Sequence, residues 1–192
     1  MSRKSEIGNF VGKKIRMYQA VSETGAGKAM MANLRRGAGH EPGELPELFG
    51  TILLDMPEEF MSKDGIATKK EWACYIALTL YALHQQGYDL KSRPMHVNES
   101  ISIGRALAQL AKTSEDVNAE KRALQKLKAF ATAVDMREAS HHLRGIIQLL
   151  GNRGIPIDYE MLAEDLYEFQ FADGKNRVNL RWGQDFYSRG SR

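Results

Sequence analysis

The segment TKKEWACYIALTLYALHQQG, residues 68–87, decides the fold class because it carries the clearest helical pattern of the chain. Thr68 and Glu71 stand three residues apart, so each side chain can pair with a free amide group of the first helical turn. One helical face then carries Trp72, Ile76, Thr79 and Leu83. Since Gly87 ends this periodic stretch, the segment predicts one long helix that packs through an apolar face.

The same helical period recurs on both sides of this segment. Helices with apolar residues at mostly three- and four-residue steps are predicted over residues 7–21, 28–36, 101–111, 115–134, 135–151, 158–169 and 176–187. The last could also be a strand after the Asp173-Gly174 turn, and we favour a helix. Residues 40–67 contain Pro42, Pro46 and Pro57 and are expected to hold only brief helices. The class predicted is all-α, a compact multi-helix bundle.

The length and composition are those of an ordinary globular domain. The 192 residues are 43% hydrophobic and 27% charged, so we expect a single helical domain over residues 1–192, with two small lobes, 1–112 and 113–192, as an option. Cys74, the only cysteine, lies in an apolar helical pattern, which excludes an intramolecular disulfide and favours a buried thiol in a reducing compartment. Because no uninterrupted apolar stretch indicates a signal peptide or a membrane span, a cytoplasmic location is expected.

Residues 22–28, SETGAGK, invite a nucleotide-binding interpretation that their spacing does not support. The phosphate-loop motif requires Gly five residues before its Gly-Lys pair and Ser or Thr after the Lys, whereas Ser22 and Ala29 occupy these positions. The preceding residues also predict a helix where the motif requires a strand. A glycine-rich hinge between two helices is the favoured interpretation.

Metal-binding and catalytic patterns are weak. His141 and His142 are adjacent on a predicted helix, so they point about 100° apart and do not both face one metal ion. Glu160, Glu164 and Glu168 stand at four-residue steps, which would suit a metal-dependent nuclease, but no companion Asp or catalytic Lys accompanies them. A solvated acidic helix face is favoured, and no catalytic residue, metal ligand or cofactor is predicted.

Basic residues are segregated along the chain, although the net charge of +3 is by itself a weak indication of a nucleic-acid partner. Residues 40–64 contain seven acids and one Lys, whereas residues 121–128 contain four bases and no acid. At about 100° per residue these bases fall on one side of a helix. They are Lys121, Arg122, Lys126 and Lys128, and the opposite side carries Leu124, Leu127, Phe130 and Val134.

The following helix repeats this arrangement. Its polar row consists of Arg137, His141, Arg144 and Gln148, opposite Leu143, Ile147 and Leu150. Helices joined by a short turn are expected to be antiparallel neighbours, so the two rows can lie side by side. Such rows predict a positive surface that contacts phosphates whatever the base sequence. The nucleic-acid-binding candidates are Arg35, Arg36, Arg105, Lys121, Arg122, Lys126, Lys128, Arg137 and Arg144.

Another class of function fits the same charges. Basic helix faces are common on ordinary solvated surfaces, and such faces can also bind proteins. The alternative is a helical adaptor that binds an acidic protein partner and has no direct nucleic-acid role. Copurification of a protein partner without RNA would favour it.

Five short motifs, in order over about residues 30–187, resemble the CasB family. They are NLRRG at 33–37, ALTLYALHQQG at 77–87, SIGRALA at 102–108, HLR at 142–144 and WGQDF at 182–186. CasB proteins are the small subunits of the type I-E CRISPR surveillance complex, Cascade. The order of the motifs is more persuasive than any one of them.

The resemblance implies an all-helical, non-catalytic subunit, present as a pair along the inner face of an RNA-guided complex. Its implied partners are a second copy, the other Cascade subunits, the guide RNA and both strands of target DNA during R-loop formation. The matching bases are Arg35, Arg36, Arg105, Lys121, Arg122, Lys128 and Arg144, with Lys128 where the family pattern suggests Arg. The residues before Lys28 and the acidic segment 40–64 fit the family least.

A sequence-indifferent basic track suits that role, because guide pairing supplies the sequence specificity of such a complex. Aromatic platforms would add stacking to the phosphate contacts. However, Trp72 and Trp182 occupy apolar positions, and both are expected in the core.

Overall fold

The computed structural model describes residues 5–188, and the regular elements within them are helices joined by turns and irregular segments. The helices are α1 Glu6–Val21, α2 Gly25–Gly37, α3 Phe49–Ile52, α4 Lys69–His84, α5 Ile103–Lys112, α6 Ala119–Thr132, α7 Met136–Arg153, α8 Tyr159–Phe169 and α9 Ala172–Tyr187. Two single-turn 3-10 helices, Pro46–Leu48 and Glu58–Phe60, lie in the proline-containing segment. The described residues form no strand beyond one isolated bridge between His96 and Ile157. The all-α prediction is confirmed.

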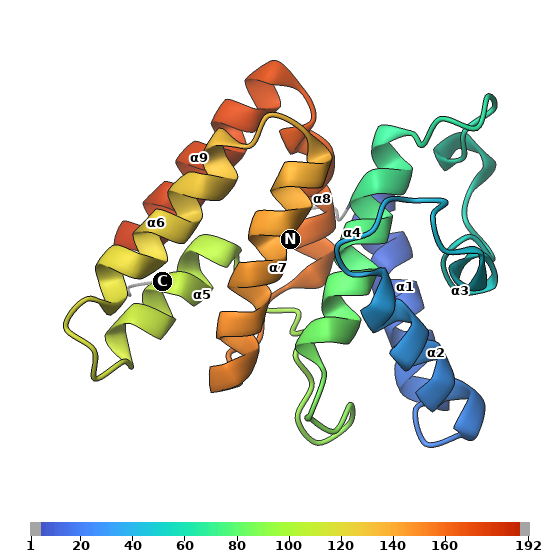
Figure 1. Cartoon of the computed structure of the whole chain (residues 1–192), viewed down its shortest axis with the longest axis horizontal. Coiled ribbons are helices and arrows are strands. Elements are labelled where there is room, and N and C mark those ends of the chain that lie inside the picture. The colour runs from blue at the N-terminus through green and yellow to red at the C-terminus, as the bar shows by residue number, and fades with distance from the viewer. Residues whose placement is uncertain (1–4, 189–192) are drawn as a thin grey trace.

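Helix α4 lies at the centre of the molecule. Its capping box is formed as expected, because Thr68 Oγ1 accepts from the Glu71 amide at 3.0 Å and Glu71 Oε2 accepts from the Thr68 amide at 2.7 Å. Every residue from Ala73 to Ala82 is buried, so α4 is covered on all sides and not along a single face. Figure 1 shows α4 between α7 on one side and α1 and α2 on the other, and α8 packs against it as well.

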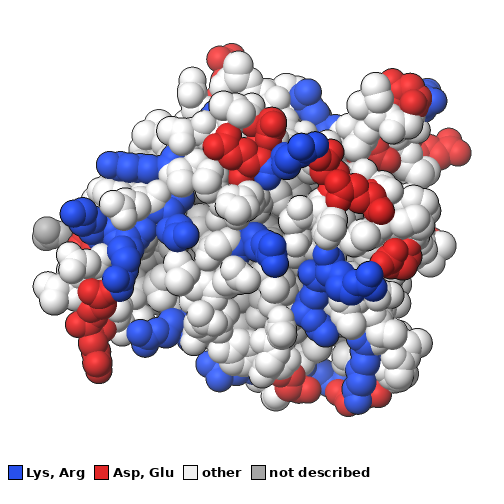
Figure 2. All heavy atoms as spheres, viewed as in Figure 1, with Lys and Arg blue, Asp and Glu red and all other residues white. Residues whose placement is uncertain are grey.

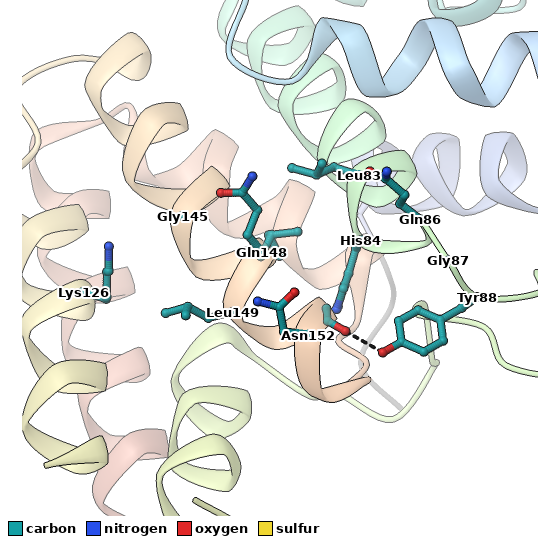
Figure 3. Close-up of a pocket in the computed structure, with 12 residues that line it drawn as sticks. Leu83, His84, Gln86, Gly87, Tyr88, Lys126, Gly145, Gln148, Leu149 and Asn152 are labelled. Atoms are coloured by element: carbon teal, nitrogen blue, oxygen red, sulfur yellow. Dashed lines mark hydrogen bonds between the residues drawn. The ribbon is translucent and has the colours of Figure 1, made fainter. Parts of the chain in front are cut away.

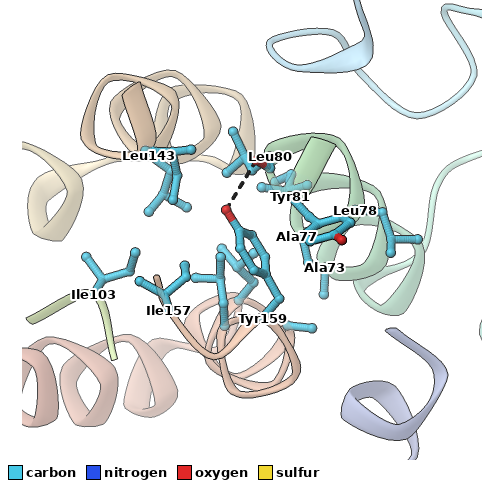
Figure 4. Packing of buried hydrophobic residues seen from close by; sticks show 14 of the residues in the cluster. Ala73, Ala77, Leu78, Leu80, Tyr81, Ile103, Leu143, Ile157 and Tyr159 are labelled. Atoms are coloured by element: carbon cyan, nitrogen blue, oxygen red, sulfur yellow. Dashed lines mark hydrogen bonds between the residues drawn. The ribbon is translucent and has the colours of Figure 1, made fainter. Parts of the chain in front are cut away.

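The residues around Tyr159 show how tightly this centre is packed. Ala73, Ala77 and Leu80 of α4 face Leu143 of α7 and the Tyr159 ring at the start of α8 (Figure 4). The Tyr159 hydroxyl lies 3.2 Å from the Leu80 carbonyl, to which it donates, and 3.0 Å from His84 Nδ1. These bonds satisfy polar groups inside an apolar region, where an unpaired group would be costly.

Helices α5, α8 and α9 meet in a second packed region, around Trp182. Gly104 lies against the Trp182 backbone so closely that no Cβ could fit there, and the glycine therefore sets how closely α5 approaches α9. The Trp182 ring is fully buried and donates from Nε1 to Asp165 Oδ2 at 2.6 Å, while Arg181 pairs with Oδ1 of the same carboxylate at 2.5 Å. Trp182 is in the core as predicted, whereas Trp72 is only half-buried at its edge.

Several helix boundaries differ from the predicted ones. The glycine-rich run is not a hinge: Thr24 Oγ1 accepts from the Gly27 amide at 2.9 Å, so these residues form the first turn of α2. Helix α9 likewise begins at Ala172 and takes Asp173-Gly174 into its first turn. Helix α6 is shorter than predicted and ends at Thr132, which leaves Val134 85% exposed and outside the apolar face.

No helix in the described part of the chain combines the length and the apolar character needed to cross a bilayer.

The carboxylate of Asp165 holds the α8–α9 contact together, so its removal tests that contact. Burial raises the pKa of Asp165 to about 6, and Arg181 and Trp182 oppose this rise. Asp165→Ala leaves the buried Trp182 indole N–H without its acceptor and removes one of the two carboxylate partners of Arg181. We expect a loss of about 3 to 5 kcal/mol in unfolding free energy by urea titration. Glu115→Ala, at an exposed loop acid, should lose less than about 0.5 kcal/mol, and equal losses in the two variants would contradict this role.

His84 makes the stability of the fold depend on pH. Burial lowers its pKa to about 4, below the unfolded value near 6.5, so the folded protein binds fewer protons and loses stability as the pH falls from 6.5 towards 4. His84→Phe keeps a ring of similar size and removes this titration. Between pH 7 and 5 the wild type should lose about 2 kcal/mol more than this variant in urea titrations. Asp165 titrates in both proteins and cancels from the difference, so parallel profiles would refute the assignment.

Candidate nucleic-acid interface

The predicted basic row of α6 is exposed, as its helical angles require. Lys121, Arg122, Lys126 and Lys128 all lie on the surface, whereas Leu127 and Phe130 are buried on the opposite side. Leu124 is half-buried at the boundary. Helix α6 therefore packs through one side and presents its charges on the other.

The second row lies on α7, which packs against α6. Arg137, His141, Arg144 and Gln148 are exposed, and Leu143, Ile147 and Leu150 are buried. The two helices pack against each other, and the end of the Lys126 side chain of α6 lies near Gly145 of α7. The side-by-side arrangement expected from the short turn is present.

Helix α2 brings its terminal bases to the same side of the molecule. The Arg144 guanidinium lies beside Gly39, just after α2, because a Cβ added to Gly39 would be 3.3 Å from Nη1. On the side shown in Figure 2, Lys and Arg side chains gather over α6, α7 and α2. We call this side the basic face. Arg105 is exposed on α5, and none of these contacts links it to the other bases.

Some of the predicted bases are already paired with acids. Arg36 lies 3.2 Å from Glu47, Arg137 pairs with Glu41, and Arg122 pairs with Asp116. Within residues 5–188 the remaining six candidates form no ion pair: Arg35, Arg105, Lys121, Lys126, Lys128 and Arg144. The acidic segment thus neutralises part of the basic face, and Figure 2 shows acidic side chains around the start of α7. These six side chains are therefore the candidates whose charge no acid within residues 5–188 neutralises.

A trough of about 840 Å³ runs over α7 beside Lys126. Its floor is the α7 stripe of Gly145, Gln148, Leu149 and Asn152. One wall is the end of α4 with the turn that follows it, Leu83, Gln86, Gly87 and Tyr88, and Lys126 of α6 forms the other (Figure 3). We call it the α7 trough.

A second hollow of about 390 Å³ lies next to the α7 trough, across the turn that contains Tyr88. The two share Gln86, Gly87 and Tyr88, and the second is lined by Arg35 and Lys28 of α2. It also contains Glu23 and Asp89, and Asp89 accepts hydrogen bonds from Ser92 in its own loop. Lys126 of α6 and the cations Lys28 and Arg35 of α2 therefore line two neighbouring hollows, one on each side of the turn at residues 86–88.

The α7 trough and Lys28 were not foreseen from the sequence. Lys28 begins a predicted helix but belongs to no basic row, and nothing in the sequence places α2 beside the end of α4. The amide side chains of the trough come from α7 and from the turn after α4, which are far apart in the chain. Only Gln148 was noted, as a member of the α7 row.

The three glutamates of α8 do not form a solvated face, which corrects that prediction. Glu160 is buried beside Gly12 of α1, with Arg16 Nη1 at 3.5 Å. Glu164 Oε1 accepts from the Ser5 amide at 2.8 Å, and Glu168 pairs with Arg177 and Arg181. The four-residue steps place these acids against α1 and α9, where they join helices. Among the described residues, no three His, Cys, Asp or Glu side chains are grouped as metal ligands would be.

Comparisons with known proteins agree on one family. The family model for CRISPR-associated protein Cse2 matches residues 30–187. CasB from Thermobifida fusca is 30% identical, with a TM-score of 0.78 over 97% of this chain and 100% of that one. CasB from Thermus thermophilus is 20% identical with a TM-score of 0.65, covering 92% of this chain and 97% of its own. A Cse2-family CRISPR-associated protein, also from Thermus thermophilus, is 22% identical with a TM-score of 0.64 and the same coverage, and no curated protein sequence matches.

Proposed function

Because the chain belongs to the Cse2, or CasB, family of CRISPR-associated proteins, we propose that it is a non-catalytic small subunit of a type I-E Cascade complex. In that complex it binds the backbone of target DNA and stabilises the R-loop and the displaced strand in antiviral defence. The observation that carries this proposal is the group of Lys and Arg side chains on the basic face that form no ion pair, above all Lys126 and Arg144. The complex is cytoplasmic.

The chemistry of the basic face suits a strand of any sequence. Lys side chains are flexible point charges that contact phosphates without reading bases, and Arg adds a planar donor fork. Guide pairing reads the sequence in such a complex, so its protein subunits need to hold backbones only. The Lys and Arg residues lie on three helices that share a core, so the backbone positions from which they extend are fixed relative to one another. This arrangement supports binding to an extended strand.

Assembly with other subunits is the second part of the proposal. An apolar hollow of about 360 Å³ lies between the acidic segment and α4, lined in part by Leu45, Phe49, Leu53 and Met61. Phe49 and Leu53 are exposed. Since exposed apolar patches mark interaction surfaces, this hollow supports contacts with larger complex subunits, alongside the guide RNA and a second copy of the chain.

Charge reversal on the basic face tests the DNA contact. Lys126→Glu and Arg144→Glu should each weaken binding of single-stranded DNA about tenfold and lower the slope of log affinity against log salt by about one, since each removes a phosphate contact. The measurement is filter binding of the purified protein across a series of salt concentrations.

Lys63→Glu is the matched control for charge. Lys63 is exposed within the acidic segment and pairs with no acid among residues 5–188, so its reversal changes the net charge equally without touching the basic face. Equal losses in all three variants would show that total charge alone governs binding. Unchanged affinity and slope for Lys126→Glu and Arg144→Glu would refute the proposed contact.

Assembly is tested by expression beside the remaining subunits of the complex. We expect the chain to copurify with a short guide RNA and larger subunits, and nuclease treatment should release the RNA from the purified particle. Copurification with an acidic protein, free of RNA, would instead establish the adaptor function.

A further inference from the structure

The α7 trough has a chemical character that phosphate binding alone does not explain. The residues that line it include no Asp or Glu. Gln86, Gln148 and Asn152 bring three amide side chains, each of which both donates and accepts hydrogen bonds. Leu83 and Leu149 add apolar surface beside them. A ligand that suits all of this has apolar faces, edges that donate and accept, and no positive charge.

The glycine in the floor keeps this space open at a cost to the helix. Gly145 lies in the middle of α7, where glycine is less favourable than alanine. Its packing does not demand a glycine, since an added Cβ would meet only Lys126 Nζ, at the ordinary contact distance of 3.5 Å. Gly104 differs, because its Cβ would collide with the Trp182 backbone. A larger side chain at 145 would instead fill the trough beside Lys126.

The position of the trough relates its ligand to the strand. Lys126 forms one wall, and Lys28 and Arg35 line the neighbouring hollow across the turn that forms the opposite wall. A strand whose phosphates meet these cations at both ends crosses the trough between them. The nucleobases of a single strand are unpaired and expose apolar faces that a protein surface can cover. Those of a duplex are already stacked and paired.

We propose that the α7 trough seats unpaired nucleobases of single-stranded DNA, an inference that rests on the proposed function. The amides of Gln86, Gln148 and Asn152 meet base edges, and Leu83 and Leu149 contact base faces. Amides pair with donors and acceptors alike, so the seat accepts any base without selecting a sequence. The protein then recognises two features of its ligand: the negative charge of the phosphates and the presence of unpaired nucleobases.

Comparing the binding of two oligonucleotides of equal length distinguishes recognition of phosphates from recognition of nucleobases. One is a mixed-sequence DNA strand of about 20 nucleotides, longer than typical single-strand site sizes, and the other carries the same phosphates with abasic spacers throughout. The full-length protein should bind the strand with bases about tenfold more tightly, as expected from the contribution of one well-seated base. Both affinities should fall with salt at the same slope, because the phosphate contacts are shared.

Gly145→Leu fills the floor without changing any charge. It should reduce the affinity for the base-bearing strand to that of the abasic strand and leave abasic binding and the salt slope unchanged. Gly183→Leu is the control, because Gly183 lies within α9 and an added Cβ there meets nothing within 4 Å. It should bind both strands as the wild type does. Leucine favours helix over glycine at both sites, and circular dichroism checks that both variants are folded.

The outcomes distinguish the seat from the function on which it rests. Equal wild-type affinity for the two strands would overturn the seat and leave the phosphate-binding proposal intact. A preference for bases that survives in Gly145→Leu would overturn the assignment of the seat to this trough. Binding of neither strand would overturn the proposed DNA contact and the seat with it.

Discussion

The complete burial of α4 is the constraint on which the rest of the structure depends. A helix covered on every side needs a ring of neighbours, and α1, α2, α7 and α8 each bury an apolar stripe against it. Each neighbour is then left with one outward face, and on α2 and α7 this face carries bases. Since α6 packs on α7, its row joins theirs. The positive surface is thus the solvent side of the helices that enclose or extend one apolar core.

Glycines and buried acids set how closely these helices approach. Gly104 admits the Trp182 backbone against α5, and Gly12 admits the carboxylate of Glu160 against α1. The Asp165 carboxylate accepts hydrogen bonds from both Trp182 and Arg181 of α9. Buried carboxylates of this kind are stable only with hydrogen-bonded partners, so they fix the register of α8 against its neighbours.

The sequence predicts most of the helices and the exposed rows, because helical periodicity is a local property. It fails where the outcome depends on contacts between distant segments. Val134 has the right helical angle for the apolar face, but α6 ends before it. Glu160, Glu164 and Glu168 look solvated by spacing alone, since nothing local shows that α1 and α9 cover them. The pairing of Arg137 with Glu41 depends in the same way on a loop folding back over α7.

The acids paired with Arg36 and Arg137 act as intramolecular counterions for these two cations. A polyelectrolyte gains affinity by releasing condensed ions when a cation binds it, but these two cations are already neutralised by Glu47 and Glu41. If DNA binds there as proposed, it has to displace a tethered carboxylate, which remains at high local concentration and competes for the same cation. Short stretches of backbone compete poorly against such neighbours, whereas a long strand with many charges does so readily. Under the proposed function, the acidic segment is then a threshold that favours extended polyanions over small ones.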